Sequence, residues 1–332
     1  MRQKKNPRTR LLTGIQPSGS PHLGNYFGVM KKQIDYQNDQ DLDCFFFIAD
    51  LHALTTVRDP KKMRENSLNL VLDYLALGLD PNKVTFYRQS QIPHHTELTW
   101  ILSTISPMGL LERAHAYKDA TQKGLKDATV GLFTYPILMA ADILLYSPEI
   151  VPVGQDQKQH IEIARDIAEK FNHTFGETFT IPNPEIDKKT AIVPGTNGLK
   201  MSKSYNNTIP IFAEPNELKK AVMSIETDST PLEDPKDAEA CLVYQIYKLL
   251  ADKKAQASMK ERLEAGNYGY GHAKTELFNL LESHFSEARQ KRIELSKNLD
   301  YITEVLKIGE QKAEAVAEAK MVEVKAKIGL NL

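Results

Sequence analysis

Apolar and polar positions alternate along the first two hundred residues in a way that predicts strands and helices in turn. Short apolar runs, typical of strands buried on both faces, cover residues 10–15, 44–50, 83–90 and 149–154. Longer segments with apolar residues at helical spacing accompany them, at 24–37, 60–80, 95–106 and 156–172. This alternation favours an α/β fold with a doubly wound parallel sheet covered by helices.

The last third of the chain is expected to be entirely helical. No proline follows Pro235, and helical patterns cover 236–252, 257–266, 272–299 and 301–329. A glycine-rich turn, "NYGYGH", interrupts them before the longest segments. We therefore predict two domains, a Rossmann-like catalytic domain over residues 1–208 and a C-terminal all-helical domain over residues 209–332.

Composition narrows the class of protein. The 332 residues include 42 Lys and Arg against 43 Asp and Glu, a net charge of −1. This balance argues against nonspecific coating of nucleic acid but allows a local basic patch for a selective partner. The two cysteines, Cys44 and Cys241, form neither a disulfide framework nor a metal-binding motif, and no signal peptide or membrane span is recognised. We expect a reduced, cytoplasmic, soluble protein with no membrane association.

Two further features favour ordinary structural roles. His94 and His95 look like a metal-binding pair, but no third ligand follows at a suitable spacing, so we interpret them as the start of a helix and predict no metal site on the protein. Trp100, the single tryptophan, lies among apolar residues and is predicted to belong to the core.

The first loop with candidate chemistry is "TGIQPSGSPHLGN", residues 13–25, which joins a strand to a helix. Its glycines, such as Gly24, let a backbone approach a ligand closely, and a helix N-terminus offers free N–H groups to phosphate. His22 and Asn25 add polar groups at the same place. The alternative interpretation is a tight turn with a helix cap.

Two more loops fit the same ligand. Gly154 and Asp156 follow a predicted strand, where an acidic residue can bind a ribose hydroxyl, although Asp156 can also be only a helix cap. In "LKMSKSYNN", residues 199–207, Lys200 and Lys203 can meet a polyphosphate and stabilise charge as a phosphoryl bond breaks. Ser202 and Ser204 add hydroxyl donors, although lysines in such a loop can also be merely solvated. Together the three loops indicate ATP bound across the sheet.

Two segments carry a resemblance to a known family. His22-Leu23-Gly24-Asn25 and Lys200-Met201-Ser202-Lys203-Ser204 resemble the two signatures of class I aminoacyl-tRNA synthetases. Residues 134–172, together with "TGIQPSG", "FFFIADLHALT" and "LLERAHAYKD", are similar to the tryptophanyl-tRNA synthetases of that family. The resemblance covers the chain from about residue 11 to its end.

The resemblance implies a two-step reaction, in which tryptophan and ATP give tryptophanyl-adenylate and the tryptophanyl group then passes to tRNA(Trp). It also implies Mg²⁺ beside the phosphates, a homodimer, and an anticodon-binding role for the helical domain. The implied catalytic residues are His22, Asn25, Lys200, Ser202 and Lys203. The implied ATP-binding residues are Gln16, Pro17, Ser18, Gly24, Asn25, Gly154, Gln155, Asp156, Ile192, Lys200, Met201, Ser202, Lys203 and Ser204. The implied tryptophan-binding residues are His52, Tyr135, Met139, Asp142, Val151, Val153 and Gln157.

The pair Met139 and Asp142 also makes chemical sense without the resemblance. The two residues are three positions apart and share a helical face. An indole requires a flat apolar slot and one acceptor for its N–H, which Met139 and Asp142 can supply. The alternative is a core methionine beside a capping aspartate. These two residues alone favour that alternative, but the family resemblance favours the tryptophan pocket.

Other functions remain as alternatives. A tyrosyl-tRNA synthetase has the same scaffold, a small-molecule nucleotidyltransferase shares the first signature, and a noncatalytic synthetase-like protein can retain the fold. The chain also departs from the family pattern, because Ala120 stands where many relatives have a lysine and Gln155 replaces a frequent glutamate.

Overall fold

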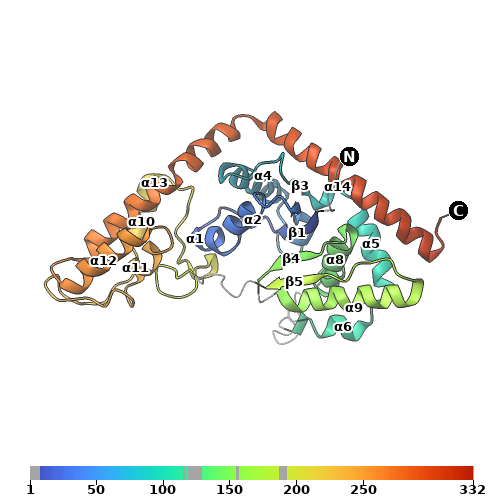
Figure 1. Ribbon diagram of the computed structural model, residues 1–332, viewed down its shortest axis with the longest axis horizontal. Helices are drawn as coiled ribbons and strands as arrows, with labels where there is room; N and C mark the ends of the chain where they lie inside the picture. Colours follow the sequence, from blue (N-terminus) through green and yellow to red (C-terminus); the bar gives the residue numbers. More distant parts are fainter. Residues whose placement is uncertain (1–7, 115–116, 119–128, 155–156, 187–192, 332) are drawn as a thin grey trace, which may run out of the picture.

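A computed structural model describes residues 8–114, 117–118, 129–154, 157–186 and 193–331. Five parallel strands form one sheet in the order β3-β2-β1-β4-β5 (Figure 1). The strands are β1 (Thr9–Ile15), β2 (Leu42–Ile48), β3 (Thr85–Arg88), β4 (Ile150–Val153) and β5 (Asn183–Ile186). The predicted doubly wound parallel sheet is therefore confirmed. Strand β5 was not predicted, because its sequence "NPEI" contains no apolar run.

Helices cover both faces of the sheet and continue into the C-terminal part (Figure 1). The first helix starts as α1 (Leu23–Asn25), passes through a π-helical turn (Tyr26–Met30) and continues as α2 (Lys31–Tyr36). The others in the sheet domain are α3 (Asp50–Ala53), α4 (Pro60–Ala76), a 3-10 turn at Gln89–Gln91, α5 (His94–Ser103), α6 (Met108–Glu112), α8 (Val130–Tyr146) and α9 (Lys158–Phe175). Next come a 3-10 turn at Lys203–Tyr205, α10 (Pro215–Met223), α11 (Leu242–Tyr247), α12 (Lys253–Ala265), α13 (Tyr270–Ser296) and α14 (Leu299–Ile328).

Strand β2 shows why its apolar run predicted burial on both sides. Successive side chains of a strand point to opposite faces of the sheet. Accordingly, Phe45 and Phe47 belong to the cluster formed with α5, α8 and α9, whereas Phe46 and Ile48 belong to the cluster formed with α4. Both faces of the central sheet are therefore packed, and functional groups must lie at its edges or ends.

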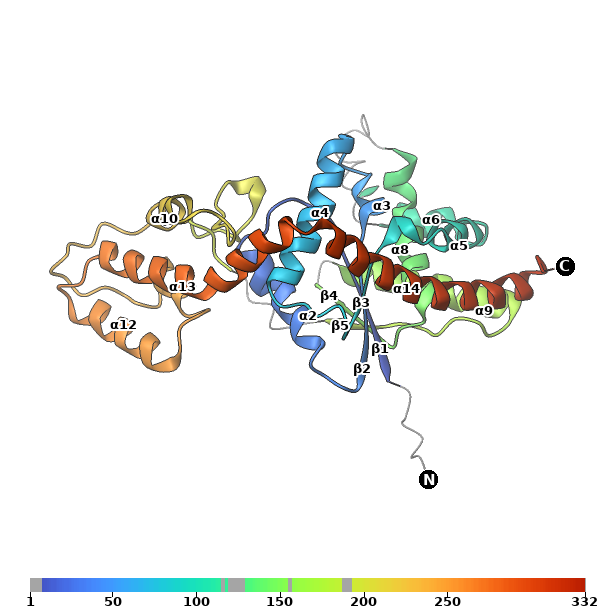
Figure 2. The same cartoon turned by 90° about the horizontal axis from the view of Figure 1, so that it is seen from above.

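The two longest helices form an arch that joins the helical part to the sheet (Figures 1 and 2). Helix α13 packs its Leu277 and Phe285 into a third core with α10 and α11. Helix α14 then crosses strand β3, and Gly309 lies so close that a Cβ atom there would meet the carbonyl oxygen of Phe86 at 1.8 Å. Since only glycine permits this approach, α14 is seated directly on the sheet.

Two expectations from the sequence are wrong. The helix expected over 236–252 covers only Leu242–Tyr247, because the buried Lys236 donates hydrogen bonds to the carbonyl oxygens of Pro231 and Asp234 and holds its segment in a turn. Trp100 is not a core residue, since it is 73% exposed on α5. In addition, none of the described helices is long and apolar enough to cross a membrane.

Candidate active site

Several sequence-predicted site residues that the structure describes follow the carboxyl ends of the strands. Because the strands are parallel, their carboxyl ends lie together, and ligands bind at the point where strand order reverses, here between β1 and β4. Strand β1 leads into the loop that carries His22, and β2 leads into α3, which carries His52. Strand β3 leads to Gln89 and β4 to Gly154.

The two signature segments, far apart in sequence, are in direct contact. The backbone N–H of Gly24 points to the sulfur of Met201 at 3.3 Å. Next to this contact, the N–H of Leu23 donates to the carbonyl oxygen of Ile209, just after the lysine loop, at 3.0 Å. A Cβ atom at Gly24 would lie 3.2 Å from the Cβ of Met201, so glycine suits this close approach. The structure thus brings the histidine turn and the lysine loop together, as the predicted ATP site requires.

The charge of Lys203 acts on His22. Burial lowers the pKa of His22, the nearby charge of Lys203 lowers it as well, and the two together bring it to about 4. The imidazole is therefore neutral near pH 7, and its Nδ1 has no hydrogen-bond partner among the described residues. Burial also lowers the pKa of the Lys203 ammonium, although the carboxylate of Asp73 opposes the shift. Lys200 and Lys203 are both exposed.

Asn207, which the sequence analysis left without a role, shapes the lysine loop. It is 1% exposed, its side-chain oxygen accepts the N–H of Ser202 at 2.8 Å, and its amide nitrogen donates to the carbonyl oxygen of Lys200 at 3.2 Å. A Cβ atom at Gly195 would meet the Asn207 amide nitrogen at 2.1 Å. Gly195 therefore makes room for Asn207, and Asn207 fixes the backbone on both sides of Met201.

Asn25, the third residue of α1, reaches back to cap the start of that helix. Its Oδ1 accepts the backbone N–H of His22 at 3.1 Å, which leaves its amide group as the part that can donate to a ligand. Of the three preceding predicted ATP contacts, Gln16 and Ser18 are exposed and Pro17 is buried. The predicted contacts Gln155, Asp156 and Ile192, and the departure at Ala120, lie outside the described residues.

Asp142 is the most densely hydrogen-bonded side chain of the predicted tryptophan pocket. It is 1% exposed on α8, and its carboxylate accepts from His52 Nε2 at 2.9 Å, Gln89 Nε2 at 2.7 Å and His95 Nδ1 at 2.6 Å. Burial acts to raise its pKa, but the hydrogen bonds and charges of His52 and His95 outweigh burial and lower the pKa to about 2. Asp142 is therefore an ionised acceptor in an apolar surrounding.

The other predicted pocket residues have the following surroundings. The rings of His52 and Tyr135 meet edge to face at 6.2 Å, and the Tyr135 hydroxyl lies 2.5 Å from His160 Nε2. Met139 packs partly buried against the same core, as does Val153. Two more members of the predicted set are the fully packed Val151 and the half-buried Gln157 at the start of α9.

Sequence analysis missed Gln89 and His95. Gln89 follows the carboxyl end of β3, so the rule that placed ligands at strand ends could have identified it. His95 was interpreted as a helix start, and it does lie in the first turn of α5. Nothing in the local sequence shows that its side chain points to Asp142, 47 positions away.

His94 has neighbours that sequence spacing did not reveal. Its Nε2 lies 3.3 Å from Glu314 Oε1 and 2.7 Å from Glu318 Oε2, both on α14. The three side chains form the group of metal-type donors found among the described residues. Because the side chains of Glu314 and Glu318 are 42% and 58% exposed, we interpret the group as polar contacts between α14 and α5.

The fold and the site define a class of protein. A parallel sheet whose switch point holds a histidine turn docked against a lysine loop is the arrangement expected of a class I aminoacyl-tRNA synthetase. Residues 4–286 match the family of tRNA synthetases class I (W and Y), and the chain belongs to this family.

The similar proteins belong to one branch of that family, the tryptophan–tRNA ligases. The chain is 55% identical over 322 residues to a tryptophan–tRNA ligase from Fusobacterium nucleatum, covering 97% of this chain and 98% of the relative. It is 51% identical to the tryptophan–tRNA ligase of Rhodopirellula baltica, with 97% and 100% coverage. Among solved structures, tryptophanyl-tRNA synthetase from Campylobacter jejuni complexed with ADP and tryptophan superposes with a TM-score of 0.92 at 51% identity, covering 97% of this chain and all of that one.

Proposed function

We infer that this chain is a tryptophan–tRNA ligase, which activates L-tryptophan with ATP and transfers it to tRNA(Trp). This conclusion rests on the 55% and 51% sequence identity to such ligases, which extends over 97% of the chain. The ADP and tryptophan bound by the Campylobacter jejuni relative support ATP as the nucleotide and tryptophan as the amino acid. Tyrosine specificity is the alternative within the same family, since a phenol O–H can also donate to Asp142, and the identity to tryptophan–tRNA ligases over nearly the whole chain disfavours it.

We propose that tryptophan lies against Asp142, with its indole N–H donating to the carboxylate. Met139 supplies an apolar surface, and His52, Tyr135, Val151, Val153 and Gln157 complete the pocket. A site with a buried acceptor rejects a ligand without a donor, because the acceptor would be left unpaired. The three hydrogen bonds that hold Asp142 support this role.

ATP is proposed to bind between the histidine turn and the lysine loop. The first group of contacts comprises Gln16, Pro17, Ser18, Gly24 and Asn25, and the second comprises Lys200, Met201, Ser202, Lys203 and Ser204. Gly154, with Gln155, Asp156 and Ile192, would hold the adenosine. The direct contacts between the turn and the loop support a single binding site formed from both.

The reaction then requires no side-chain nucleophile. A carboxylate oxygen of tryptophan attacks the α-phosphorus of ATP, and the bond from that phosphorus to the bridging oxygen breaks, which releases pyrophosphate. Lys203 and Lys200 stabilise the charge on the leaving pyrophosphate, while the neutral His22 and the Asn25 amide hold phosphate oxygens on the other side. The terminal ribose hydroxyl of the tRNA next attacks the acyl carbon of the adenylate, and AMP leaves.

Mg²⁺ is proposed to accompany ATP rather than to bind a site of its own on the protein. The group of metal-type donors found among the described residues lies on α5 and α14, not beside the lysine loop. Magnesium commonly binds through substrate phosphates and keeps several waters. It would supply positive charge to the phosphate oxygens when bound with ATP.

We propose that the helical domain over residues 209–332 recognises the anticodon of the tRNA. It projects away from the sheet, while its last helix, α14, remains seated on β3 (Figures 1 and 2). The ion pairs Arg88–Glu310, at 2.8 Å, and Lys325–Glu97, at 2.8 Å, support a fixed position of α14 on the catalytic domain.

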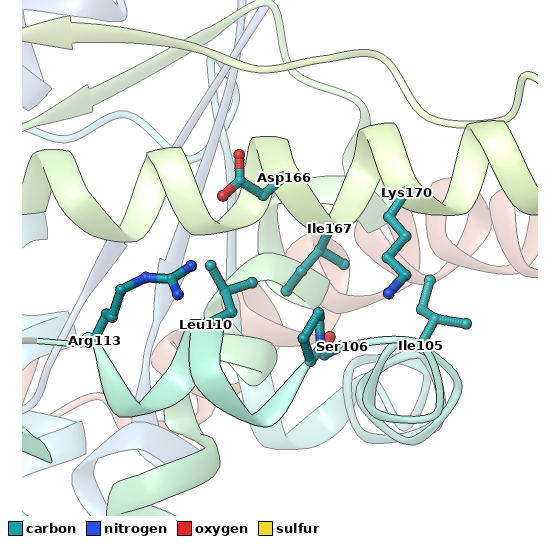
Figure 3. A pocket seen from close by; sticks show the side chains of 8 residues that line it. Ile105, Ser106, Leu110, Arg113, Asp166, Ile167 and Lys170 are labelled. Carbon is teal, nitrogen blue, oxygen red and sulfur yellow. The ribbon is translucent and has the colours of Figure 1, made fainter.

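A homodimer is proposed through the surface around α5 and α6. Trp100 is 73% exposed there and Met108 is 64% exposed, which is unusual for such large apolar side chains on a surface that faces only water. A hollow beside them is lined by Ile105, Ser106, Leu110, Arg113, Asp166, Ile167 and Lys170 (Figure 3). This hollow is distinct from the substrate pocket and can receive side chains of a second copy.

Amino-acid-dependent exchange of pyrophosphate into ATP tests the proposed function. The purified chain is expected to exchange with tryptophan and to show far less exchange with tyrosine. A preference for tyrosine would establish the alternative specificity, and absence of exchange with every amino acid would establish a noncatalytic relative.

A further inference from the structure

The two oxygens of the Asp142 carboxylate differ in how they are occupied. Oδ1 accepts two hydrogen bonds, from Gln89 Nε2 at 2.7 Å and from His95 Nδ1 at 2.6 Å. Oδ2 accepts one among the described residues, from His52 Nε2 at 2.9 Å. A carboxylate oxygen accepts about two hydrogen bonds. Oδ1 is therefore filled, and Oδ2 keeps one acceptor direction for a ligand.

A second hydrogen bond fixes the orientation of each of the two donors to Oδ1. Gln89 and His95 are both 0% exposed. The side-chain oxygen of Gln89 accepts the N–H of Leu51 at 3.1 Å, which fixes the orientation of its amide group and directs its nitrogen to Asp142. His95 Nδ1 must carry a proton, because an ionised carboxylate can only accept. The Tyr146 hydroxyl, 3.2 Å from His95 Nε2, fixes the ring from the opposite side.

We propose that Gln89 and His95 are positioning residues for substrate selection, which clamp Asp142 Oδ1 so that Oδ2 presents one acceptor to an N–H-bearing aromatic side chain. The proposal rests on the proposed tryptophan specificity of the same pocket. Neither residue contacts the substrate itself. Tyr146 belongs to the same arrangement, because it holds the His95 ring from behind.

The clamp has a chemical consequence beyond geometry. Without donors to Oδ1, burial would raise the pKa of Asp142, and the carboxyl group could take up a proton. A protonated carboxyl group can turn its O–H toward the ligand, and it then accepts an indole N–H less well. Loss of Gln89 or His95 should therefore lower the preference for a ligand with an N–H, besides weakening binding.

The test compares tryptophan with an analogue in which sulfur replaces the indole N–H, β-(3-benzothienyl)alanine, in pyrophosphate exchange. The wild-type chain should prefer tryptophan in kcat/KM. In His95→Leu and Gln89→Met, this preference should fall by about tenfold or more, the effect of losing one hydrogen bond to a charged group. The change should appear mainly in the KM for tryptophan.

Matched variants separate positioning from packing. His94→Leu changes the neighbouring residue on the same helix, which contacts Glu314 and Glu318 but not Asp142, and should leave the preference unchanged. His95→Asn, whose amide nitrogen can lie near the position of Nδ1, should restore most of the preference. Equal losses of kcat/KM for both substrates in His95→Leu and Gln89→Met would show a purely structural role and overturn the proposal.

If His95→Leu and Gln89→Met do not fold, a milder variant tests the positioning role instead. Tyr146→Phe removes only the hydroxyl behind His95 and should lower the preference for tryptophan a few-fold, whereas an unchanged preference would overturn the proposal. If the wild-type chain activated no tryptophan at all, the proposed function would fail instead. That outcome is recognised from the wild type alone, before any variant is compared.

Discussion

The ammonium group of Lys203 lies 2.7 Å from the backbone carbonyl oxygen of Ser18, although 185 positions separate the two residues. This hydrogen bond crosses the space in which ATP is proposed to bind, and it connects the lysine loop to the turn after β1. A phosphate group entering the site can replace the carbonyl oxygen as the partner of the ammonium. Lys203 is thus already oriented toward the proposed reacting groups.

Substitution Lys203→Ala is expected to slow adenylate formation about 100-fold or more, because it removes a charge that acts on the leaving pyrophosphate. Tryptophan binding should change little, since Lys203 does not contact the Asp142 pocket. Single-turnover adenylate formation and equilibrium tryptophan binding measure the two effects. Lys219→Ala, on the exposed side of α10, is the matched control. An unchanged single-turnover rate in Lys203→Ala would exclude a catalytic role for the loop.

Substitution Asp142→Asn is expected to raise the KM for tryptophan about 10- to 100-fold, because the neutral amide loses the charge-assisted hydrogen bonds and accepts an indole N–H poorly. The KM for ATP should change much less. Steady-state pyrophosphate exchange with each substrate varied in turn measures both constants. Parallel increases in both KM values would indicate a general disturbance of the sheet edge rather than loss of the tryptophan acceptor.

The pKa of His22 predicts a pH dependence of stability. The pKa is lowered from 6.5 to about 4 in the folded chain, so between these pH values the unfolded chain binds a proton that the folded chain does not. The free energy of unfolding should therefore decrease as the pH falls from about 6.5 toward 4. Urea denaturation of the wild type and of His22→Gln over this range measures the difference. If both lost stability equally, the folded pKa of His22 would not be lowered.

The ion pair between Arg292 and Asp73 is expected to stabilise the contact of α13 with α4. Arg292 Nε lies 2.5 Å from a carboxylate oxygen of Asp73, which is 1% exposed. Burial raises the pKa of Asp73 to about 6 even though Arg292 opposes this shift, so an unpaired carboxylate here is costly. Arg292→Met should lower the free energy of unfolding by about 3 kcal/mol.

Urea denaturation at pH 7.5 measures this effect of Arg292→Met. The exposed pair Lys31 and Asp35 on α2 provides the control, because Lys31→Met should change the free energy of unfolding by less than about 1 kcal/mol. Equal effects of the two substitutions would contradict the importance assigned to burial at Asp73.

The proposed dimer surface predicts a change of oligomeric state. The wild type is expected to sediment as a dimer, and the double variant Trp100→Ser, Met108→Ser as a monomer, because two large apolar side chains would be lost from the interface. Sedimentation velocity at several concentrations measures this. Val322→Ser, at a 57% exposed position of α14, should leave the dimer intact. A monomeric wild type would contradict the proposal directly.

Much of the fold was predictable because its signals are local. The apolar run that became β2 and the alternation of strands with helices are properties of neighbouring residues, as are the glycines and lysines of the two signatures. These patterns were sufficient to predict the parallel sheet, which is confirmed, and to propose a nucleotide site at its edge. The pattern over residues 236–252 failed, since it contained no sign that Lys236 would be buried and would hold the chain before Leu242 in a turn.

The sequence by itself thus determined most of the elements and the loops that carry the candidate chemistry. Only the tertiary structure decided which residues meet: Lys203 with the backbone of Ser18, Asn207 with Gly195, and Gln89 and His95 with Asp142. Local periodicity states that a helix has an apolar face but not what covers it, so Trp100 was assigned to the core although no described residue buries it. Contacts across the sheet depend on packing between distant segments, and no local pattern encodes their partners.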